Sequence, residues 1–192
     1  IGTETLSRVV DTNDRDSMIF ADGAGATIIQ DSVNSGGIMA HESVTYTDNN
    51  EVDMLFFGDS YETNNFDQFI KMHGRKVYEF ALSRVPDAMK ACLDQSGTQI
   101  QDLKKIFIHQ ANEKMDEAIV KRFYRLYKEK VPANVLPMNI ETHGNSSVAT
   151  IPTLFDQVLK GQKEGHELSK GDVVLFASVG AGMNINAITY QI

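Results

Sequence analysis

The chain has a single cysteine, Cys92, and contains neither a long hydrophobic run nor a basic run in its 192 residues. One cysteine cannot form a disulfide within the chain, which is typical of proteins from a reducing, cytoplasmic setting. No apolar stretch approaches the roughly 20 residues that a membrane-spanning helix needs. A net charge of −8 without clustered Lys and Arg argues against nucleic acid as a partner. We therefore expect a cytoplasmic protein that binds neither membrane nor nucleic acid.

What is present is the composition of an ordinary globular protein, 42% hydrophobic and 23% charged. The length permits one medium domain or a large part of a bigger protein. The chain opens at Ile1 without a methionine and runs directly into residues 6–10 (LSRVV), which the pattern predicts as a strand. Because an opening in mid-strand is more typical of a cut piece than of a natural start, we expect a fragment of a longer chain.

Two segments share a glycine-rich pattern. Residues 18–29 (MIFADGAGATII) predict a strand, a turn at the glycines and a second strand. Residues 173–190 repeat the pattern around the Gly-Ala-Gly of residues 180–182. Two such copies indicate an internal duplication.

Helices and one more strand lie between these segments. Residues 103–108 (LKKIFI) predict a buried strand, and the polar residues 47–66 predict a long loop. Strands that alternate with helices favour an α/β fold whose sheet is covered on its faces. Apolar residues at helical spacing predict helices over residues 75–85, from Pro86 to near Gly97, over residues 113–126, and from Pro152 to Gly161.

Three polar or glycine-rich positions could bind a ligand. His109 follows the strand 103–108, and ligands bind at the carboxyl ends of strands in α/β sheets; alternatively its ring is satisfied by backbone groups. Asn145 offers an amide donor of the kind that stabilises an oxyanion, or else it is a turn residue before a helix. The turn at 180–182 either lets backbone N–H groups approach a ligand or closes a hairpin. It is no dinucleotide-binding motif, because GxGxxG is absent.

In combination these segments resemble a known family. Residues 107–112 (FIHQAN), residues 144–152 (GNSSVATIP) and residues 172–182 (DVVLFASVGAG) follow one another as in the C-terminal half of the thiolase-fold condensing enzymes, and most closely resemble beta-ketoacyl-acyl-carrier-protein synthase III. Residues 16–29 are similar to that family's central strand pair. Residues 72–81 (MHGRKVYEFA) are similar to one of its helix starts.

The resemblance implies a thiolase-like fold, the C-terminal half of a duplicated αβαβα layered architecture. Residues 1–33 would be the final strands of the N-terminal half, and residues 34–192 would form the C-terminal half. It also implies an acyltransferase of fatty acid biosynthesis that works as a homodimer. Such an enzyme condenses an acyl-CoA starter with malonyl-acyl-carrier-protein and uses these substrates without a cofactor or metal.

The resemblance also assigns roles to four residues of this chain. His109 and Asn145 would donate hydrogen bonds to the malonyl thioester oxygen as negative charge develops on it. The backbone N–H of Ala181 would contribute to the oxyanion hole at the acyl-cysteine. Lys114 would contact the acyl carrier protein, or else it is a solvated first-turn lysine.

The nucleophilic cysteine of the family has no counterpart here. Cys92 lies on an apolar helical stripe with Met89 and Leu93, where a cysteine behaves as a small hydrophobic side chain. The chain alone is therefore expected to be inactive and to act with a missing N-terminal half. The alternative is a non-catalytic subunit or scaffold that pairs with a true synthase.

Two other chemistries are weaker interpretations. Ser146 or Ser147 beside His109 would suggest a hydrolase, but no acidic orienting residue and no nucleophile elbow is identifiable. A metal site from His109, His143 and Asp22 matches no spacing of metal ligands.

Overall fold

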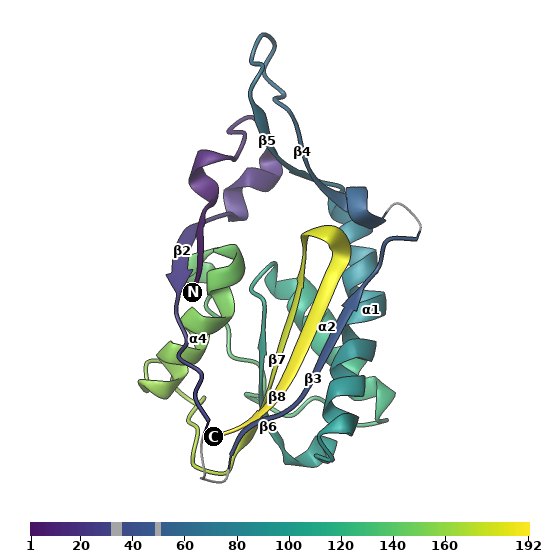
Figure 1. Ribbon diagram of the computed structural model, residues 1–192, viewed down its shortest axis with the longest axis vertical. Helices are drawn as coiled ribbons and strands as arrows, with labels where there is room; N and C mark the ends of the chain where they lie inside the picture. Colours follow the sequence, from purple (N-terminus) through teal and green to yellow (C-terminus); the bar gives the residue numbers. More distant parts are fainter. Residues whose placement is uncertain (32–35, 49–50) are drawn as a thin grey trace.

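A four-stranded mixed sheet forms the centre of the computed structural model, which describes residues 1–31, 36–48 and 51–192 (Figure 1). In sheet order the strands are β3 (Gly37–Thr45), β8 (Asn184–Gln191), β7 (Val173–Gly180) and β6 (Leu103–Ile108). Strand β8 runs antiparallel to both β3 and β7, and β7 runs parallel to β6.

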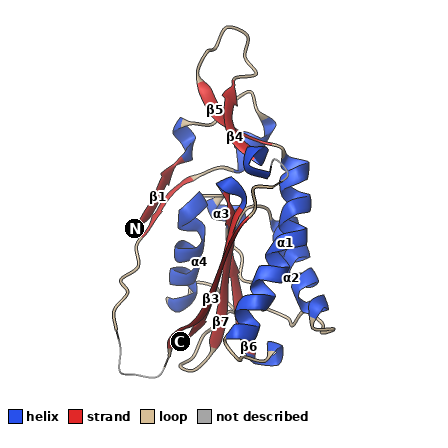
Figure 2. Cartoon of the chain, turned by 45° about the vertical axis from the view of Figure 1, so that its right-hand side comes forward, coloured by secondary structure: helices blue, strands red, loops and turns tan. Residues whose placement is uncertain are grey.

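Helices cover both faces of this sheet (Figure 2). Helices α1 (Gly74–Gln95) and α2 (Glu113–Leu126) pack on one face, and α4 (Thr150–Leu159) packs on the other. The short helix α3 (Ile140–His143) precedes α4 in the chain. Every residue of β6 except Lys104 is buried, as is typical of a strand between two helical layers. No helix in the described ranges is long and apolar enough to cross a membrane.

Two small antiparallel hairpins complete the fold. Strands β1 (Gly2–Thr5) and β2 (Asp22–Gly25) pair beside α4. Strands β4 (Leu55–Asp59) and β5 (Gln68–Met72) project from one end of the molecule, at the top of Figure 1.

A buried ion pair connects the second hairpin to the N-terminal segment. The Lys71 ammonium on β5 lies 2.7 Å from Asp11 and 3.1 Å from Asp14. The hydrogen bond from Lys71 holds the pKa of Asp11 well below its ordinary value. Lys71 and Asp11 are almost completely buried, so removing Lys71 would leave the Asp11 carboxylate in the interior without a cation.

Several predictions about the central sheet are confirmed. The α/β class is correct, and the strand expected over residues 103–108 and the helix expected over 113–126 have those bounds. The C-terminal strand, glycine-rich turn and strand are also present, as β7, a single 3₁₀ turn and β8. The helix expected from Pro152 begins two residues earlier, at Thr150.

The predictions for the N-terminal segment are wrong. The strand expected over residues 6–10 is a 3₁₀ turn (Leu6–Arg8), and much of the one expected over 18–21 belongs to another (Arg15–Ile19). The expected turn at the glycines is itself the strand β2, and residues 26–29 form no regular element. The glycines serve close packing rather than a turn, because a Cβ atom on Gly25 would lie 2.3 Å from the Pro152 ring. The two glycine-rich copies therefore differ in structure.

Two further expectations are corrected. Helix α1 runs unbroken through Pro86, where two helices were expected. A proline in a helix costs about 3 kcal/mol, but the helix buries large side chains on both sides of Pro86, each contributing roughly 1.5–3 kcal/mol. The loop expected over 47–66 contains β4, which pairs with β5. Residues 49 and 50 of that loop, and the domain boundary expected between residues 33 and 34, lie outside the described residues.

One acidic side chain is buried without a well-formed hydrogen bond. Asp116 lies in the first turn of α2 with no exposed surface. Neither of its carboxyl oxygens has a hydrogen-bond partner among the described residues. Burial raises the pKa of Asp116 to about 8, against the opposing effect of the backbone at Asn112 and Ala111. The carboxyl group is therefore largely protonated at neutral pH.

This burial predicts a stability that falls as pH rises. Below pH ~4 the carboxyl is protonated in both the folded and the unfolded chain, whereas between pH ~4 and ~8 only the unfolded chain ionises it. The free energy of unfolding should then fall by up to about 1.4 kcal/mol per pH unit in this window. Urea unfolding at several pH values should show that Asp116→Asn removes this slope. Substitution of the exposed neighbour, Glu117→Gln, should keep it; an unchanged slope in Asp116→Asn would contradict the assignment.

Candidate active site

His109 is fixed at the carboxyl end of β6, as the sequence predicted. Its backbone N–H donates to the Ala177 carbonyl at 2.9 Å and so extends the parallel pairing of β6 with β7. The Ala111 N–H then donates to the His109 carbonyl at 2.9 Å, which turns the chain toward α2. The Asn112 side chain caps that helix by accepting from the Met115 N–H. The imidazole is therefore held between a strand end and a helix start.

A fully buried glutamine ties this turn to the segment that carries Asn145. The Gln110 side chain donates to the Ile108 carbonyl at 3.0 Å and accepts from the Asn139 N–H at 3.0 Å. Asn139 in turn donates to Gln157 on α4. Sequence reasoning missed Gln110; its signal was a polar residue two positions after a strand that ends in the apolar residues 106–108.

Asn145 is held by the N-terminal segment. Its N–H donates to the Ile19 carbonyl at 2.7 Å, and its carbonyl accepts from the Ala21 N–H at 2.9 Å. These two bonds form a parallel bridge centred on Phe20. The approach requires Gly144, whose φ is +63° and where a Cβ atom would lie 3.0 Å from the Ile19 carbonyl oxygen.

The side chains of His109 and Asn145 each have one end occupied within the chain. The Asn145 Oδ1 accepts from the Ser147 N–H at 2.9 Å, which leaves the amide N–H groups free to donate elsewhere. The His109 Nδ1 lies 2.8 Å from the Thr150 hydroxyl oxygen. Sequence reasoning also missed Thr150, which it read only as part of a helix start.

His109 and Asn145 line the same cavity, of about 600 Å³. Ala181 lines it too, on the turn after β7, so three of the four predicted residues come together. Lys114 does not line it, but is exposed in the first turn of α2 beside Met115, which does. Burial lowers the pKa of His109 to about 4, so its ring is neutral at pH 7. The cavity also has an apolar wall that includes Phe56, Phe57, Ile70, Val77 and Tyr78.

The prediction that Cys92 packs in the core is confirmed. It is fully buried in the cluster between α1 and the sheet, with its Sγ 3.3 Å from the Thr189 hydroxyl. Burial raises the pKa of the Cys92 thiol above its ordinary value. A protonated thiol in the core is a poor nucleophile.

The weaker chemistries receive no support from the contacts. His109 meets the hydroxyl of Thr150 rather than that of Ser146 or Ser147. Asp22 instead accepts hydrogen bonds from Ser7, and these lower its pKa. The residues that the structure describes contain no cluster of three His, Cys, Asp or Glu placed to hold a metal.

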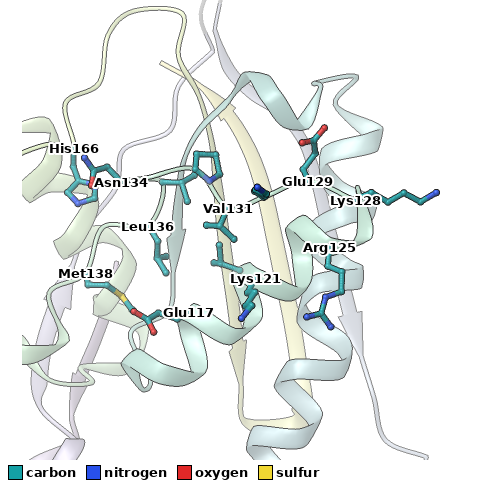
Figure 3. Close-up of a pocket in the computed structure, with 14 residues that line it drawn as sticks. Glu117, Lys121, Arg125, Lys128, Glu129, Val131, Asn134, Leu136, Met138 and His166 are labelled. Atoms are coloured by element: carbon teal, nitrogen blue, oxygen red, sulfur yellow. The ribbon is translucent and has the colours of Figure 1, made fainter.

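A larger hollow, of about 760 Å³, is lined mainly by side chains of α2 and of the segment that follows it (Figure 3). Charged side chains surround it, and none of the four predicted site residues lines it. The charged side chains that line this hollow include Glu117, Lys121, Arg125, Lys128 and Glu129. Cavity size alone therefore does not identify the candidate site.

Comparison with known families gives matches at both ends of the chain. Residues 93–192 match the family "3-Oxoacyl-[acyl-carrier-protein (ACP)] synthase III C terminal", and residues 1–49 match "3-Oxoacyl-[acyl-carrier-protein (ACP)] synthase III". Among curated proteins, the beta-ketoacyl-[acyl-carrier-protein] synthases III of Acaryochloris marina and Vesicomyosocius okutanii are each 33% identical over the whole chain. The chain spans 57% and 56% of their lengths.

Solved structures agree in fold. The priming beta-ketosynthase of the R1128 polyketide pathway matches 99% of the chain with a TM-score of 0.82 and 25% identity, over 55% of its own length. The 3-oxoacyl-[acyl-carrier-protein] synthase III of Aquifex aeolicus matches all of the chain with a TM-score of 0.80 and 24% identity, over 56% of its own length. The family match over residues 93–192 and the shared thiolase-like fold show that this chain belongs to the 3-oxoacyl-acyl-carrier-protein synthase III family.

Proposed function

We propose that this chain supplies the malonyl-activating part of a 3-oxoacyl-acyl-carrier-protein synthase III active site. The observation that carries the proposal is the pairing of His109 and Asn145 on one cavity. One atom of each side chain is held by the chain, the His109 Nδ1 at the Thr150 hydroxyl and the Asn145 Oδ1 at the Ser147 N–H, and both residues line the cavity. Two neutral donors on one cavity suit an oxygen that becomes negative during the reaction.

The proposed reaction begins with acyl transfer. A cysteine thiolate outside this chain attacks the acyl-CoA carbonyl and expels the CoA thiolate. Malonyl-acyl-carrier-protein then loses CO₂, and the electron pair of the broken bond forms an enolate. His109 and Asn145 donate hydrogen bonds to the enolate oxygen. Because its pKa is low, the His109 side chain does so as a neutral imidazole.

The enolate carbon then attacks the acyl-cysteine. Negative charge moves to the acyl oxygen, to which the N–H of Ala181, a residue that lines the cavity, would donate. Collapse of this intermediate expels the cysteine thiolate and releases 3-oxoacyl-acyl-carrier-protein. These steps draw on a thiolate and hydrogen-bond donors, so the proposal includes no cofactor.

We also propose the partners of this chain. The relative from Acaryochloris marina is about 1.75 times as long, since the chain spans 57% of it. The remainder would carry the cysteine and cover apolar side chains such as Ile28 and Ile29, which are 92% and 78% exposed. A second copy would complete a homodimer. The single free cysteine supports a reducing, cytoplasmic location.

Lys114 is the proposed contact for the acyl carrier protein. It is exposed beside Asn112 and Met115, which line the cavity. A cation at the cavity rim would attract an acidic carrier and orient it for delivery of the malonyl group.

The first prediction from the proposed function tests His109 and Asn145 in the full-length enzyme. His109→Ala and Asn145→Ala should each lower the condensation rate about 10²–10³-fold, the cost of one oxyanion donor. Transfer of acetyl from acetyl-CoA to the cysteine should stay near wild type, because that step precedes enolate formation. A discontinuous assay with radiolabelled malonyl-acyl-carrier-protein separates the two steps.

The exposed His143, in the same segment as Asn145, provides the matched control. His143→Ala should condense at close to the wild-type rate. A wild-type condensation rate in His109→Ala would contradict the proposed role of His109.

The second prediction concerns Lys114. Lys114→Glu should raise KM for malonyl-acyl-carrier-protein by about 2- to 10-fold, as expected for an exposed ion pair, and the effect should shrink at high salt. Its kcat should be retained. Lys170→Glu, at the opposite end of the sheet before β7, should leave KM unchanged. Equal KM values for both variants would exclude Lys114 as the contact.

The third prediction tests where the nucleophile lies. After incubation of the 192-residue chain with acetyl-CoA, its intact mass should be unchanged, because Cys92 is buried. The full-length protein should gain one acetyl group. A stoichiometric adduct on Cys92 or on a serine of the short chain would show that it has its own nucleophile.

A further inference from the structure

The carboxylate of Asp14 joins two segments that line the cavity. Asp14 is the N-cap of the 3₁₀ turn Arg15–Ile19, and its Oδ1 accepts from the Asp16 N–H at 2.9 Å. Its Oδ2 accepts from the Lys71 ammonium at 3.1 Å. The Asp14 side chain is only 13% exposed. Each of its two oxygens therefore holds a different part of the chain.

One of these oxygens is linked to the apolar wall of the cavity. Lys71 lies on β5 between Ile70 and Met72, which both line the cavity. Successive side chains of a strand point to opposite faces, so the Lys71 side chain points away from the cavity and toward the N-terminal segment. The Ile70 N–H also donates to the Val9 carbonyl at 2.8 Å. The strand that forms this wall is thus held on the N-terminal segment by both its backbone and a buried side chain.

The other oxygen is linked to Asn145. The turn that Asp14 caps ends at Ile19, whose carbonyl accepts from the Asn145 N–H at 2.7 Å. An N-cap oxygen fixes the start of a helix, because it satisfies an N–H group that has no partner inside the helix. At about three residues per turn, the five-residue element has fewer than two turns. The cap therefore lies close to the carbonyl that holds Asn145.

We propose that Asp14 is a positioning residue for Asn145, which it holds in place by capping the 3₁₀ turn that ends at Ile19. The inference rests on the proposed function only for its kinetic consequence. Asp14 is not among the described residues that line the cavity, so it acts on the reaction only through the residues that it holds. Asn145 is the residue among them that carries a proposed donor.

The fold should survive the loss of Asp14, because Lys71 keeps a second partner. The Asp11 Oδ2 accepts from the Lys71 ammonium at 2.7 Å and from the Tyr61 N–H at 2.8 Å. A substitution at Asp14 therefore leaves the buried cation paired and keeps the hairpin attached to the N-terminal segment. What it removes is the cap on the turn before Phe20.

A double-substitution cycle in the full-length enzyme tests the proposal. Asp14→Ala should lower kcat for condensation by about tenfold, less than the loss of a whole donor, because the Asn145 amide is displaced and not removed. In an Asn145→Ala background, Asp14→Ala should lower kcat no further, because the group through which it acts is already missing. Effects that multiply in the double variant would overturn the proposal.

Two further variants serve as controls. Asp14→Asn replaces one favourable N-cap residue with another and should keep most of kcat. Asp67→Ala, at an exposed position just before β5, should condense at the wild-type rate. A loss in Asp14→Asn as large as that in Asp14→Ala would mean that the negative charge and not the cap matters, which contradicts the proposal.

Hydrogen exchange supplies a readout that does not depend on activity. In full-length protein labelled with ¹⁵N-asparagine, the backbone N–H of Asn145 should exchange about five- to tenfold faster in Asp14→Ala than in wild type, the effect of one lost cap. Asp14→Asn should exchange at the wild-type rate. An unchanged rate in Asp14→Ala would contradict the proposal. If exchange accelerates but the wild-type protein condenses nothing, the proposed function fails while the role of Asp14 stands.

Discussion

The backbone bridge between residues 19–21 and Asn145 is the constraint on which the candidate site depends. Asn145 lies in a segment without a strand of its own, so its position is set by the carbonyl and N–H groups of the N-terminal segment. Gly144 permits this approach, because any side chain there would meet the Ile19 carbonyl. The same N-terminal segment is anchored to β5 by the buried Lys71–Asp11 pair. A donor late in the chain is thus held by residues near its start.

Burial also keeps two titratable groups around the turn between β6 and α2 uncharged. Removal from water disfavours whichever form is charged, so the same cause lowers the pKa of His109 and raises that of Asp116. The two residues stand on either side of the turn between β6 and α2, where both groups remain uncharged at neutral pH. Lys114, two residues before Asp116 in the first turn of α2, is exposed to water. An exposed charged side chain and two buried uncharged groups therefore lie close together around one helix start.

The sequence predicted the elements whose signal is local and missed the contacts that are not. Strand β6 ends in a short apolar run, and helix α2 has an apolar stripe that follows the N-cap Asn112. The expected bounds of both elements agree with the structure. The N-terminal strands were misplaced, because their glycines pack against α4 and pair with β1, which no local pattern records. The bond between Gln110 and Asn139 joins residues 29 apart, and that between His109 and Thr150 joins residues 41 apart. Such contacts follow from the folded arrangement and not from spacing.

The two parts of the cavity depend differently on what lies outside this chain. The groups that orient His109 and Asn145 in the structure all belong to these 192 residues: the Ala177 carbonyl, the Thr150 hydroxyl, the Ser147 N–H and the Ile19 carbonyl. The apolar wall is less complete, since Phe57 on β4 remains 60% exposed. Donor geometry is thus preorganised within the chain, whereas the shape of the wall requires further contacts. If the proposed function holds, changes in the remainder of the protein would therefore alter which acyl group fits before they alter how the malonyl thioester is polarised.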